Sequence, residues 1–371
     1  MGACDICVRH SWLVARLAGH LEQRRAERDV IREVLALPDQ GLIDALGGLL
    51  APMLREEYER VDPAEVRGRW AATGGWAVCR HSARYPLALQ DLRDVPGVLH
   101  GRGAPDRLSD LLAHPAAAIV GARKASPEGR EAARLLGRGA SAAGVTFVSG
   151  MALGIDSAAH EGTMEAGANT IAVLACGPDV PYPRSHRDLH GRMVERAAVV
   201  SELPPGTPPY RWAFPARNRI IAALARMTVI VEAAERSGSL ITTDIAIDLG
   251  RDVAAVPGSP LNWRCAGSNA LLRDGAIVVR DAVDLIDSLA GTAPDGLFTA
   301  STAPRGTAPV PEGLPERLRD LLRAIDGGAD SVDHHAANSQ AARAVLADLT
   351  ELELLGLVSR RPGGRYARTA G

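Results

Sequence analysis

Lysine is nearly absent from this sequence, because Lys124 is the single lysine among 42 basic residues. Arginine therefore supplies almost all of the positive charge, and its planar guanidinium can bind a phosphate through two hydrogen bonds, as the ammonium of lysine cannot. The formal net charge of the 371 residues is only −2. A uniformly basic nucleic-acid coat is thereby excluded, and any site for a polyanion must be a local patch.

Long apolar runs and a disulfide framework are missing as well. No apolar stretch approaches the ~20 residues of a membrane-spanning helix, so we expect no membrane span. The chain has five cysteines and no stretch that looks like a signal peptide, a pattern that fits a reducing compartment better than a set of disulfides. We therefore expect a cytoplasmic protein with free thiols.

Hydrophobic spacing divides the chain into regions. Residues 1–72 carry apolar side chains at helical spacing and predict a small helical domain, of the SAM or helix-hairpin-helix kind. Residues 73–290 predict a larger α/β domain. Residues 291–313 have the Pro, Gly and Thr content of a linker. Residues 314–371 predict helices followed by a hairpin, which together suggest a winged-helix domain.

The middle region alternates short apolar runs with amphipathic stretches. Such continuous Val, Ile and Ala runs, separated by helices, predict a parallel sheet with helices on both faces. The expected fold is thus a doubly wound, extended Rossmann-like α/β sheet. The predicted strands lie at 116–121, 145–150, 170–177, 197–203, 227–233, 252–258 and 276–280.

The loops that follow the strands are the place to look for ligands, since helix amino termini meet the sheet there. In the first loop Gly121 permits close approach of the backbone, Arg123 and Lys124 are cationic, and Ser126 suits the N-cap of the next helix. The glycine pattern of dinucleotide-binding folds and the Gly-Lys-Ser/Thr of a P-loop are both missing. We predict a phosphate-binding turn without a nucleotide cofactor, although Gly121 could simply form a tight turn beside a solvated Arg123.

A second loop ends a strand at Gly150 and opens a helix on which Asp156 and His160 share a face. This pair could be an acid and base or two metal ligands. We favour a structural role, in which Asp156 complements the helix amino terminus. No nucleophile stands nearby in the sequence, which argues against hydrolysis.

The segment Pro204–Arg226 contains four arginines and three aromatic residues but no Asp or Glu. Cations for backbone phosphates and rings for base stacking are the two components of single-strand binding. Alternatively, Trp212 and Phe214 could be core anchors. A further loop, Ser237-Gly238-Ser239, offers hydroxyls and amides that can donate to phosphate or sugar oxygens.

Taken together, these motifs resemble the DNA-processing protein A family, also called DprA or Smf. The resemblance implies a protein, not an enzyme, that binds and protects single-stranded DNA, forms a homodimer through its α/β domain and loads the RecA recombinase in natural transformation or recombination. The matching stretches are IVGARKASPEG at 119–129, SGMALGIDSAAHEGTMEAG at 149–167, TIAVLACGPDVPYP at 170–183, FPARNRII at 214–221, VEAAERSGSLIT at 231–242 and AVPG at 255–258.

Residue roles follow from the resemblance where the motifs match. Arg123 occupies the arginine of the family's Gly-Ser-Arg turn, but Ala122 replaces the serine, and Leu153 stands where the family has arginine in the second loop. The FPARNR segment matches the family's Phe-Pro-x-Arg-Asn-Arg. The predicted DNA contacts are Gly121, Arg123, Lys124, Ser126, Gly150, Arg211, Phe214, Arg217, Asn218, Arg219, Ser237, Gly238 and Ser239.

Other functions stay open. Lysine-decarboxylase-like nucleoside-monophosphate hydrolases have a similar sheet, although their Pro-Gly-Gly-x-Gly-Thr turn and the glutamate after it are missing here. An adaptor whose winged helix binds a partner is a third possibility. Cys4, Cys7, Cys79 and His81 have the ligand types of a Cys₃His zinc site. A frayed terminus at Cys4 and Cys7 and an ordinary buried Cys79 are the simpler explanation, and we favour no metal and no cofactor.

Overall fold

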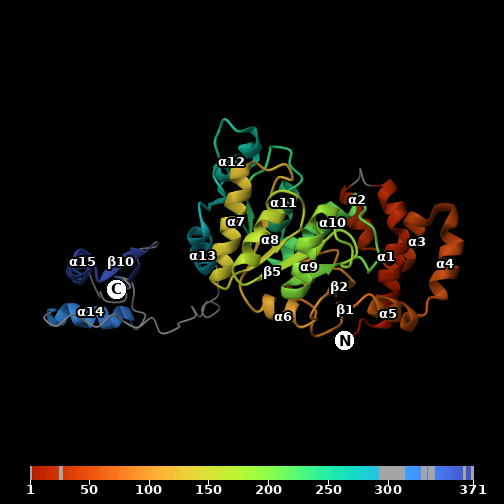
Figure 1. Ribbon diagram of the computed structural model, residues 1–371, viewed down its shortest axis with the longest axis horizontal. Coiled ribbons are helices and arrows are strands. Elements are labelled where there is room, and N and C mark those ends of the chain that lie inside the picture. The colour runs from red at the N-terminus through yellow and green to blue at the C-terminus, as the bar shows by residue number, and fades with distance from the viewer. Residues whose placement is uncertain are drawn as a thin grey trace. The chain divides into compact units, whose positions relative to one another are not determined.

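The computed structural model describes residues 2–24, 28–291, 314–326, 332, 339–361 and 365–368. It forms two compact units, Met1–Leu297 and Phe298–Gly371 (Figure 1). Among the described helices, none has the length and apolarity to cross a lipid bilayer.

The first unit begins with five helices, as the spacing of apolar residues predicts. Their core contains Leu13, Leu17 and Leu42, each almost fully buried. The side chain of Asp62 accepts a hydrogen bond from the amide of Ala64 and so caps the fifth helix. The helices are α1 (Asp5–Gln23), α2 (Arg28–Leu35), α3 (Asp39–Gly47), α4 (Ala51–Glu59) and α5 (Pro63–Ala72).

A nine-stranded sheet forms the centre of this unit, in the order β1-β2-β6-β5-β4-β3-β7-β8-β9. The strands from β6 to β9 are parallel, and each coincides with one of the seven predicted apolar runs. These strands are β3 (Ala116–Val120), β4 (Thr146–Ser149), β5 (Thr170–Leu174), β6 (Ala198–Ser201), β7 (Met227–Ile230), β8 (Asp252–Ala255) and β9 (Ile277–Val278). The predicted doubly wound α/β fold is confirmed.

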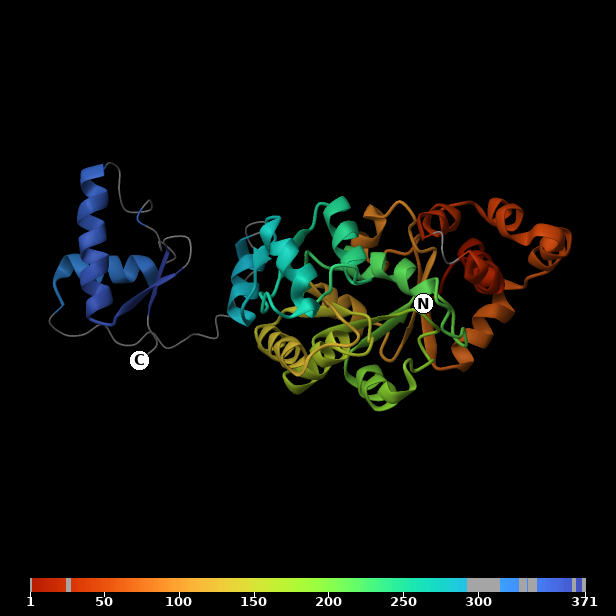
Figure 2. The same ribbon diagram turned by 90° about the horizontal axis from the view of Figure 1, so that it is seen from above.

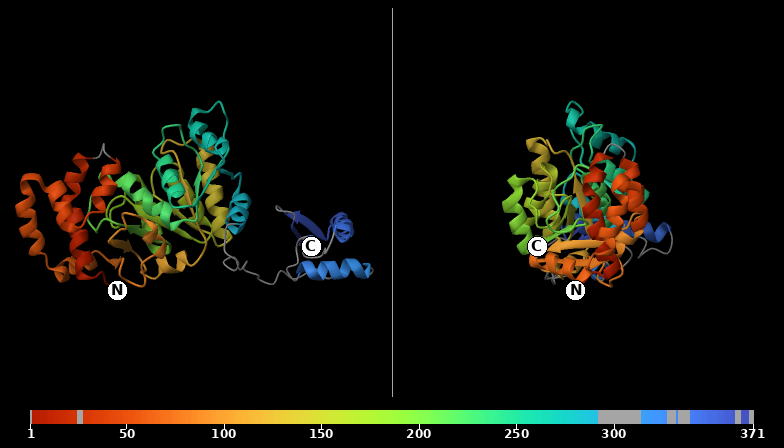
Figure 3. Two further views of the ribbon diagram at one scale, coloured as in Figure 1. Left: turned by 180° about the vertical axis from the view of Figure 1, so that it is seen from behind. Right: turned by 90° about the vertical axis from the view of Figure 1, so that its right-hand side faces the viewer.

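One edge of the sheet is antiparallel, which the sequence does not predict. Here β1 (Gly75–Cys79) pairs with β2 (Val98–Arg102), and β2 pairs antiparallel with β6. Neither strand is a continuous apolar run, so the signal for a buried parallel strand is missing. The N-terminal helices lie against this edge (Figure 3), so the separation of residues 1–72 from the α/β domain stays a prediction.

Helices cover both faces of the sheet, and the views agree on their placement. In Figure 2 the yellow and lime helices α7 (Pro127–Ala142), α8 (Ile155–Glu165) and α9 (Arg187–Arg196) lie on one face. The green α10 (Ala213–Leu224) and α11 (Leu240–Asp248) lie on the other. The chain changes faces between the neighbouring strands β3 and β7. Ligand sites of open α/β sheets form at such a switch point.

The second unit contains helices followed by a hairpin, in the predicted order. The elements are α14 (Glu316–Asp326), α15 (Ser339–Leu354), β10 (Val358–Arg361) and β11 (Arg365–Arg368). The two strands pair antiparallel, and Leu318, Leu322 and Leu352 are buried in a small core. The winged-helix assignment stays a prediction, because most residues between the helices lie outside the described ones. The predicted linker, apart from Gly291, lies outside them too.

Candidate functional site

A cleft of about 770 Å³ lies at the switch point. The loop after β3 forms one side, the loop after β7 another, and the first turns of α10 a third. The loop after β3 and the loop after β7 thus meet at one place, although Lys124 and Ser237 lie more than 100 residues apart in the sequence. The sequence-predicted residues that line the cleft are Gly121, Arg123, Lys124, Arg211, Phe214, Arg217, Asn218, Ser237, Gly238 and Ser239.

The cleft is strongly cationic in a protein of nearly balanced charge. Among the described residues that line it, six are basic and one, Asp156, is acidic. The amino terminus of α11 opens beside Ser239, and the hydroxyls of Ser237 and Ser239 lie 2.8 Å apart. Basic side chains and a helix amino terminus both favour an anion. The basic residues are Arg123, Lys124, Arg211, Arg217, Arg236 and Arg264.

The turn after β3 requires glycine at position 121. A Cβ there would lie 2.6 Å from Cγ1 of Ile155 and 2.9 Å from the carbonyl oxygen of Glu232. The next amide, of Ala122, donates to that same carbonyl at 2.7 Å. The backbone of the loop therefore packs closely against Ile155 and Glu232, and these contacts fix the position from which the side chain of Arg123 extends.

Ser126 is the N-cap of α7, as expected, and its prediction as a DNA contact stays a prediction. Its hydroxyl accepts a hydrogen bond from the amide of Gly129 at 2.9 Å, and its own amide donates to Oε2 of Glu232 at 2.7 Å. It is not among the described residues that line the cleft. Ser126 begins α7 and holds the loop in place, while Arg123 and Lys124 extend from the loop and are exposed.

The FPARNR segment forms the start of α10 and not a loop. Phe214, Arg217 and Asn218 are three and four residues apart, so they lie on one face of the helix, and all three line the cleft. Arg219 follows Phe214 by five residues and is rotated from it by about 140° around the helix axis. The helical phase therefore separates Arg219 from its neighbours in the motif.

Arg219 is not among the described residues that line the cleft, and its prediction as a DNA contact stays a prediction. Its side chain is fully buried and forms ion pairs with Asp94 at 2.9 Å and Glu202 at 2.7 Å. Burial by itself would lower the pKa of Arg219, but the two carboxylates together raise it above its ordinary value. Arg219 connects α10 to the segment before β2 and to the residue after β6, and it belongs to the scaffold.

Arg217 lies at the floor of the cleft and is held by backbone carbonyls. Its Nη1 donates to the carbonyl oxygen of Gly150 at 2.8 Å and also to that of Val173. Burial lowers the pKa of Arg217 to about 10, while the charge of Asp156 opposes the shift. The guanidinium nevertheless stays protonated at neutral pH and contributes a positive charge.

Gly150 makes room for that guanidinium and is not among the described residues that line the cleft, so its prediction as a DNA contact stays a prediction. A Cβ on Gly150 would lie 2.1 Å from Nη1 of Arg217. Gly150 is buried. Glycine is required here because any side chain would occupy the space of the Arg217 guanidinium at the end of β4.

A chain of π contacts crosses the cleft. The guanidinium of Arg123 lies 4.8 Å from the ring centroid of Phe214, and the Phe214 ring lies 5.5 Å from that of Tyr182 at a tilt of 55°. Elsewhere on the cleft wall, Arg264 stacks on Trp263 at 4.8 Å. Trp263 is 65% exposed, which leaves its face available to a ligand.

The residues of the cleft that were missing from the predicted set include Tyr182, Arg236, Trp263 and Arg264. Tyr182 and Arg236 occur within two of the matched motifs, at 170–183 and 231–242, so closer attention to those motifs could have found them. Trp263 and Arg264 follow the loop after β8. Their position after a strand of the sheet was the available signal.

Asp156 and His160 both form hydrogen bonds within the fold, and Asp156 also lines the cleft. The structural role favoured for them stays a prediction. Oδ2 of Asp156 accepts from the amide of Ala152 at 3.3 Å, and Nδ1 of His160 lies 2.7 Å from the hydroxyl of Thr170. Burial lowers the pKa of His160 to about 3, and Arg217 adds to this shift. The imidazole is therefore neutral and is used in packing β5 against α8.

Trp212 is a core anchor, one of the two roles considered for it. It is 1% exposed, and its indole Nε1 donates to the carbonyl oxygen of Ala18 at 3.0 Å. This bond joins the start of α10 to α1. The predicted metal candidates Cys4, Cys7, Cys79 and His81 come together elsewhere, at the beginning of α1 and the end of β1.

Comparison with known proteins adds the family context. The family model described as DNA recombination-mediator protein A matches residues 76–290. The chain is 35% identical over 309 residues to Protein Smf of Synechocystis sp., which covers 76% of this chain and 78% of that protein. The family match includes the sheet and every loop that lines the cleft.

Two solved structures share the fold. That of DNA processing protein A from Streptococcus pneumoniae superposes with a TM-score of 0.62 at 32% identity, over 77% of this chain and 98% of the other. That of DNA processing protein A from Helicobacter pylori, described by its single-stranded DNA binding mode, superposes with a TM-score of 0.53 at 26% identity, over 58% and 96%.

Proposed function

Since the chain belongs to the DNA recombination-mediator protein A family, we propose that its cationic cleft binds single-stranded DNA. In this proposal the arginines hold backbone phosphates and the exposed rings stack on bases. The Helicobacter pylori relative, whose structure is described by a single-stranded DNA binding mode, supports the choice of ligand.

The observation that carries the proposal is the stack of Arg123, Phe214 and Tyr182 within a cleft of six basic residues. Phosphate contacts alone would suit duplex and single strand equally. A ring can stack on a base only when the base is not already stacked within a duplex. The combination of rings and cations therefore favours a single strand.

We further propose that the protein protects single-stranded DNA and delivers it to the RecA recombinase, and that it does so as a homodimer in the cytoplasm. The family membership supports this role. In this scheme the protein performs no catalysis, since its tasks are holding and handing over a strand. Release of free base from nucleotides would contradict that view and revive the hydrolase alternative.

A salt titration tests the proposal. Fluorescently labelled oligonucleotides of about 10 to 50 nucleotides, single-stranded and duplex, are titrated with the protein at several salt concentrations, and anisotropy measures binding. We expect tighter binding to the single strand, with log K falling linearly with log salt by about 0.7 for each phosphate contacted. Binding without salt dependence, or no binding, would contradict the proposal and favour the adaptor alternative.

Deletion of residues 310–371 locates the site. Every residue of the cleft lies before that segment, so the shortened chain should keep most of its affinity for single strands. A collapse of affinity would assign binding to the C-terminal unit and not to the cleft.

A further inference from the structure

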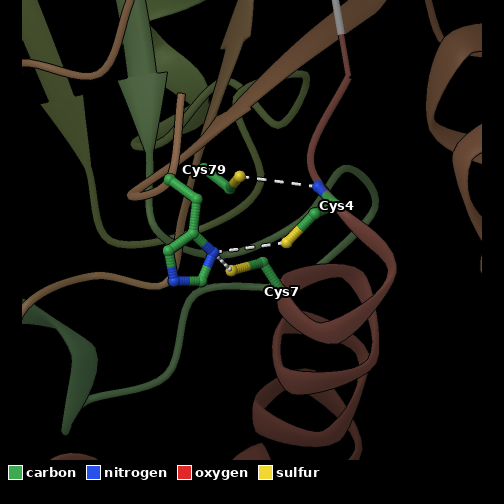
Figure 4. A group of neighbouring side chains, drawn as sticks. Cys4, Cys7 and Cys79 are labelled. Carbon is green, nitrogen blue, oxygen red and sulfur yellow. Dashed lines mark hydrogen bonds between the residues drawn. The ribbon is translucent and has the colours of Figure 1, made fainter. Parts of the chain in front are cut away.

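Three cysteines and a histidine from distant parts of the sequence meet at the edge of the sheet. Cys4 directly precedes α1, Cys7 lies in its first turns, Cys79 ends β1, and His81 follows two residues later. One ligand atom from each side chain lies within 4.8 Å of all the others. Figure 4 shows the side chains of Cys4, Cys7 and Cys79 turned toward one another.

The spacing of these atoms is close to that of a tetrahedral zinc site. Nδ1 of His81 lies 3.3 Å from Sγ of Cys4 and 3.4 Å from Sγ of Cys7. Bonds of about 2.3 Å to sulfur and about 2.0 Å to nitrogen at tetrahedral angles place ligand atoms roughly 3.5 to 3.8 Å apart. A small contraction of the longer distances would complete the coordination shell.

Hydrogen bonding alone is a poor account of the cluster. A single imidazole nitrogen faces two sulfur atoms, and one proton can serve both only in a shared, weakened geometry. The amide of Cys4 donates to Sγ of Cys79 at 3.4 Å, and an amide directed at sulfur is the type of outer contact that stabilises a metal-bound thiolate. All three cysteines are free thiols.

We propose that Cys4, Cys7, Cys79 and His81 form a structural zinc site. Thiolates and an imidazole are the donors that zinc takes in closed tetrahedral sites, and four protein ligands leave no position for a substrate. The exposed His81 and part-buried Cys4 offer the ion a route in, while Cys7 and Cys79 are buried.

The site would join the start of α1 to β1 across about 75 residues of sequence. None of the four ligands is among the described residues of the DNA-binding cleft, so this inference does not depend on the proposed function. Binding energy released by the metal would appear as stability of the contact between the N-terminal helices and the sheet.

Metal analysis of the full-length protein tests the proposal. After purification without chelator and dialysis against zinc, mass spectrometry of the metal content should find about one zinc per chain. The variant C7S should lose the metal, whereas C176S, which removes a cysteine outside the cluster, should retain it. A metal content near zero in the parent protein would overturn the proposal.

Two further variants separate ligand loss from misfolding. Because His81 is exposed, H81A should fold but release its zinc to a chelator at a concentration the parent withstands, while H81C should keep it with four thiolates. Cobalt in place of zinc should give the thiolate charge-transfer and tetrahedral absorption bands, and both should change in H81C. Equal zinc retention by H81A, or a disulfide among the three cysteines in the freshly purified protein, would contradict the site.

Discussion

The guanidinium of Arg123 lies over the ring of Phe214, 4.8 Å from its centroid. One residue comes from the turn after β3 and the other from the first turn of α10. The contact therefore joins two parts of the chain that both line the cleft.

Removal of the Phe214 ring should weaken single-strand binding without changing its salt dependence. Stacking of a base on an aromatic side chain contributes about 1 to 3 kcal/mol, so F214A should raise Kd by roughly 5- to 150-fold. Anisotropy titrations at several salt concentrations measure both quantities. F214Y, which keeps a ring, is the matched control, and equal affinity of F214A and F214Y would argue against stacking.

Removal of the charge of Arg123 should, in contrast to F214A, change the salt dependence of single-strand binding. If its guanidinium contacts one phosphate, R123A should make the slope of log K against log salt shallower by about 0.7, with little dependence on base sequence. Arg138 lies exposed on α7 and is not among the described residues of the cleft. R138A is therefore the control, and an equal change in both variants would indicate a general charge effect.

Arg219 should be essential for stability and not for binding. Its removal takes the 2.7 Å partner from Glu202 and leaves the buried Asp94 with only the longer ion pair to Arg32 at 3.4 Å. Loss of one partner of a buried ion pair typically costs about 3 to 5 kcal/mol. R219M should lower the free energy of unfolding in urea by this amount. Its folded fraction should bind single strands like the parent protein. A stable R219M with lost affinity would instead support Arg219 as a DNA contact.

Alanine at position 150 should affect both stability and binding. Its Cβ would lie 2.1 Å from Nη1 of Arg217, so the buried guanidinium must move and its bonds to the carbonyls of Gly150 and Val173 must break. We expect G150A to lower Tm and to weaken single-strand binding. The double variant G150A/R217A should recover part of the lost stability, because the clash is gone. No recovery would mean that the strain lies elsewhere.

Acidification should destabilise the protein through two buried histidines. Burial lowers the pKa of both His100 and His160 to about 3, from an ordinary value of 6.5. The unfolded chain therefore takes up the protons first as the pH falls. Each histidine then reduces the free energy of unfolding by about 1.4 kcal/mol per pH unit from 6.5 down to about 3.

Urea unfolding at pH 7.5, 6.5 and 5.5 measures this slope. The pKa of Asp156 is raised by burial, against the opposing charge of Arg217. The folded state therefore binds this proton first as the pH falls, and Asp156 makes the free energy of unfolding larger where the histidines make it smaller. H160Q should be less stable at pH 7.5 and should show a smaller loss between 6.5 and 5.5. An unchanged slope in H160Q would assign the pH dependence to other groups.

Local patterns in the sequence were enough to predict most of the fold. A buried parallel strand must be apolar on both faces, so each of the seven parallel strands leaves a continuous run that can be recognised without the structure. The N-terminal helices could likewise be predicted, because their apolar residues recur at helical spacing. The antiparallel pair β1 and β2 has no such run, and its place at the edge of the sheet depends on contacts with β6 and the helices.

The cleft was predicted as a set of loops, but tertiary structure decided which residues of those loops enter it. Arg217, Asn218 and Arg219 are consecutive and equally polar in the sequence. The phase of α10 turns the first two toward the cleft, and the carboxylates of Asp94 and Glu202, distant in sequence, neutralise the third. Sequence patterns could not reveal this choice, because it depends on which charged groups the fold brings together.

The near absence of lysine already placed the protein's positive charge on arginine, and residue types together with strand ends located where that charge would gather. Only the tertiary structure showed that Arg123 stacks on Phe214 and that Gly150 leaves room for the guanidinium of Arg217. It also brings Cys4 and Cys7 next to Cys79 and His81, which lie about 75 residues later in the sequence. The reason is physical: periodicity and turn chemistry act between neighbours along the chain, whereas ion pairs, stacking and metal ligation depend on distance in space.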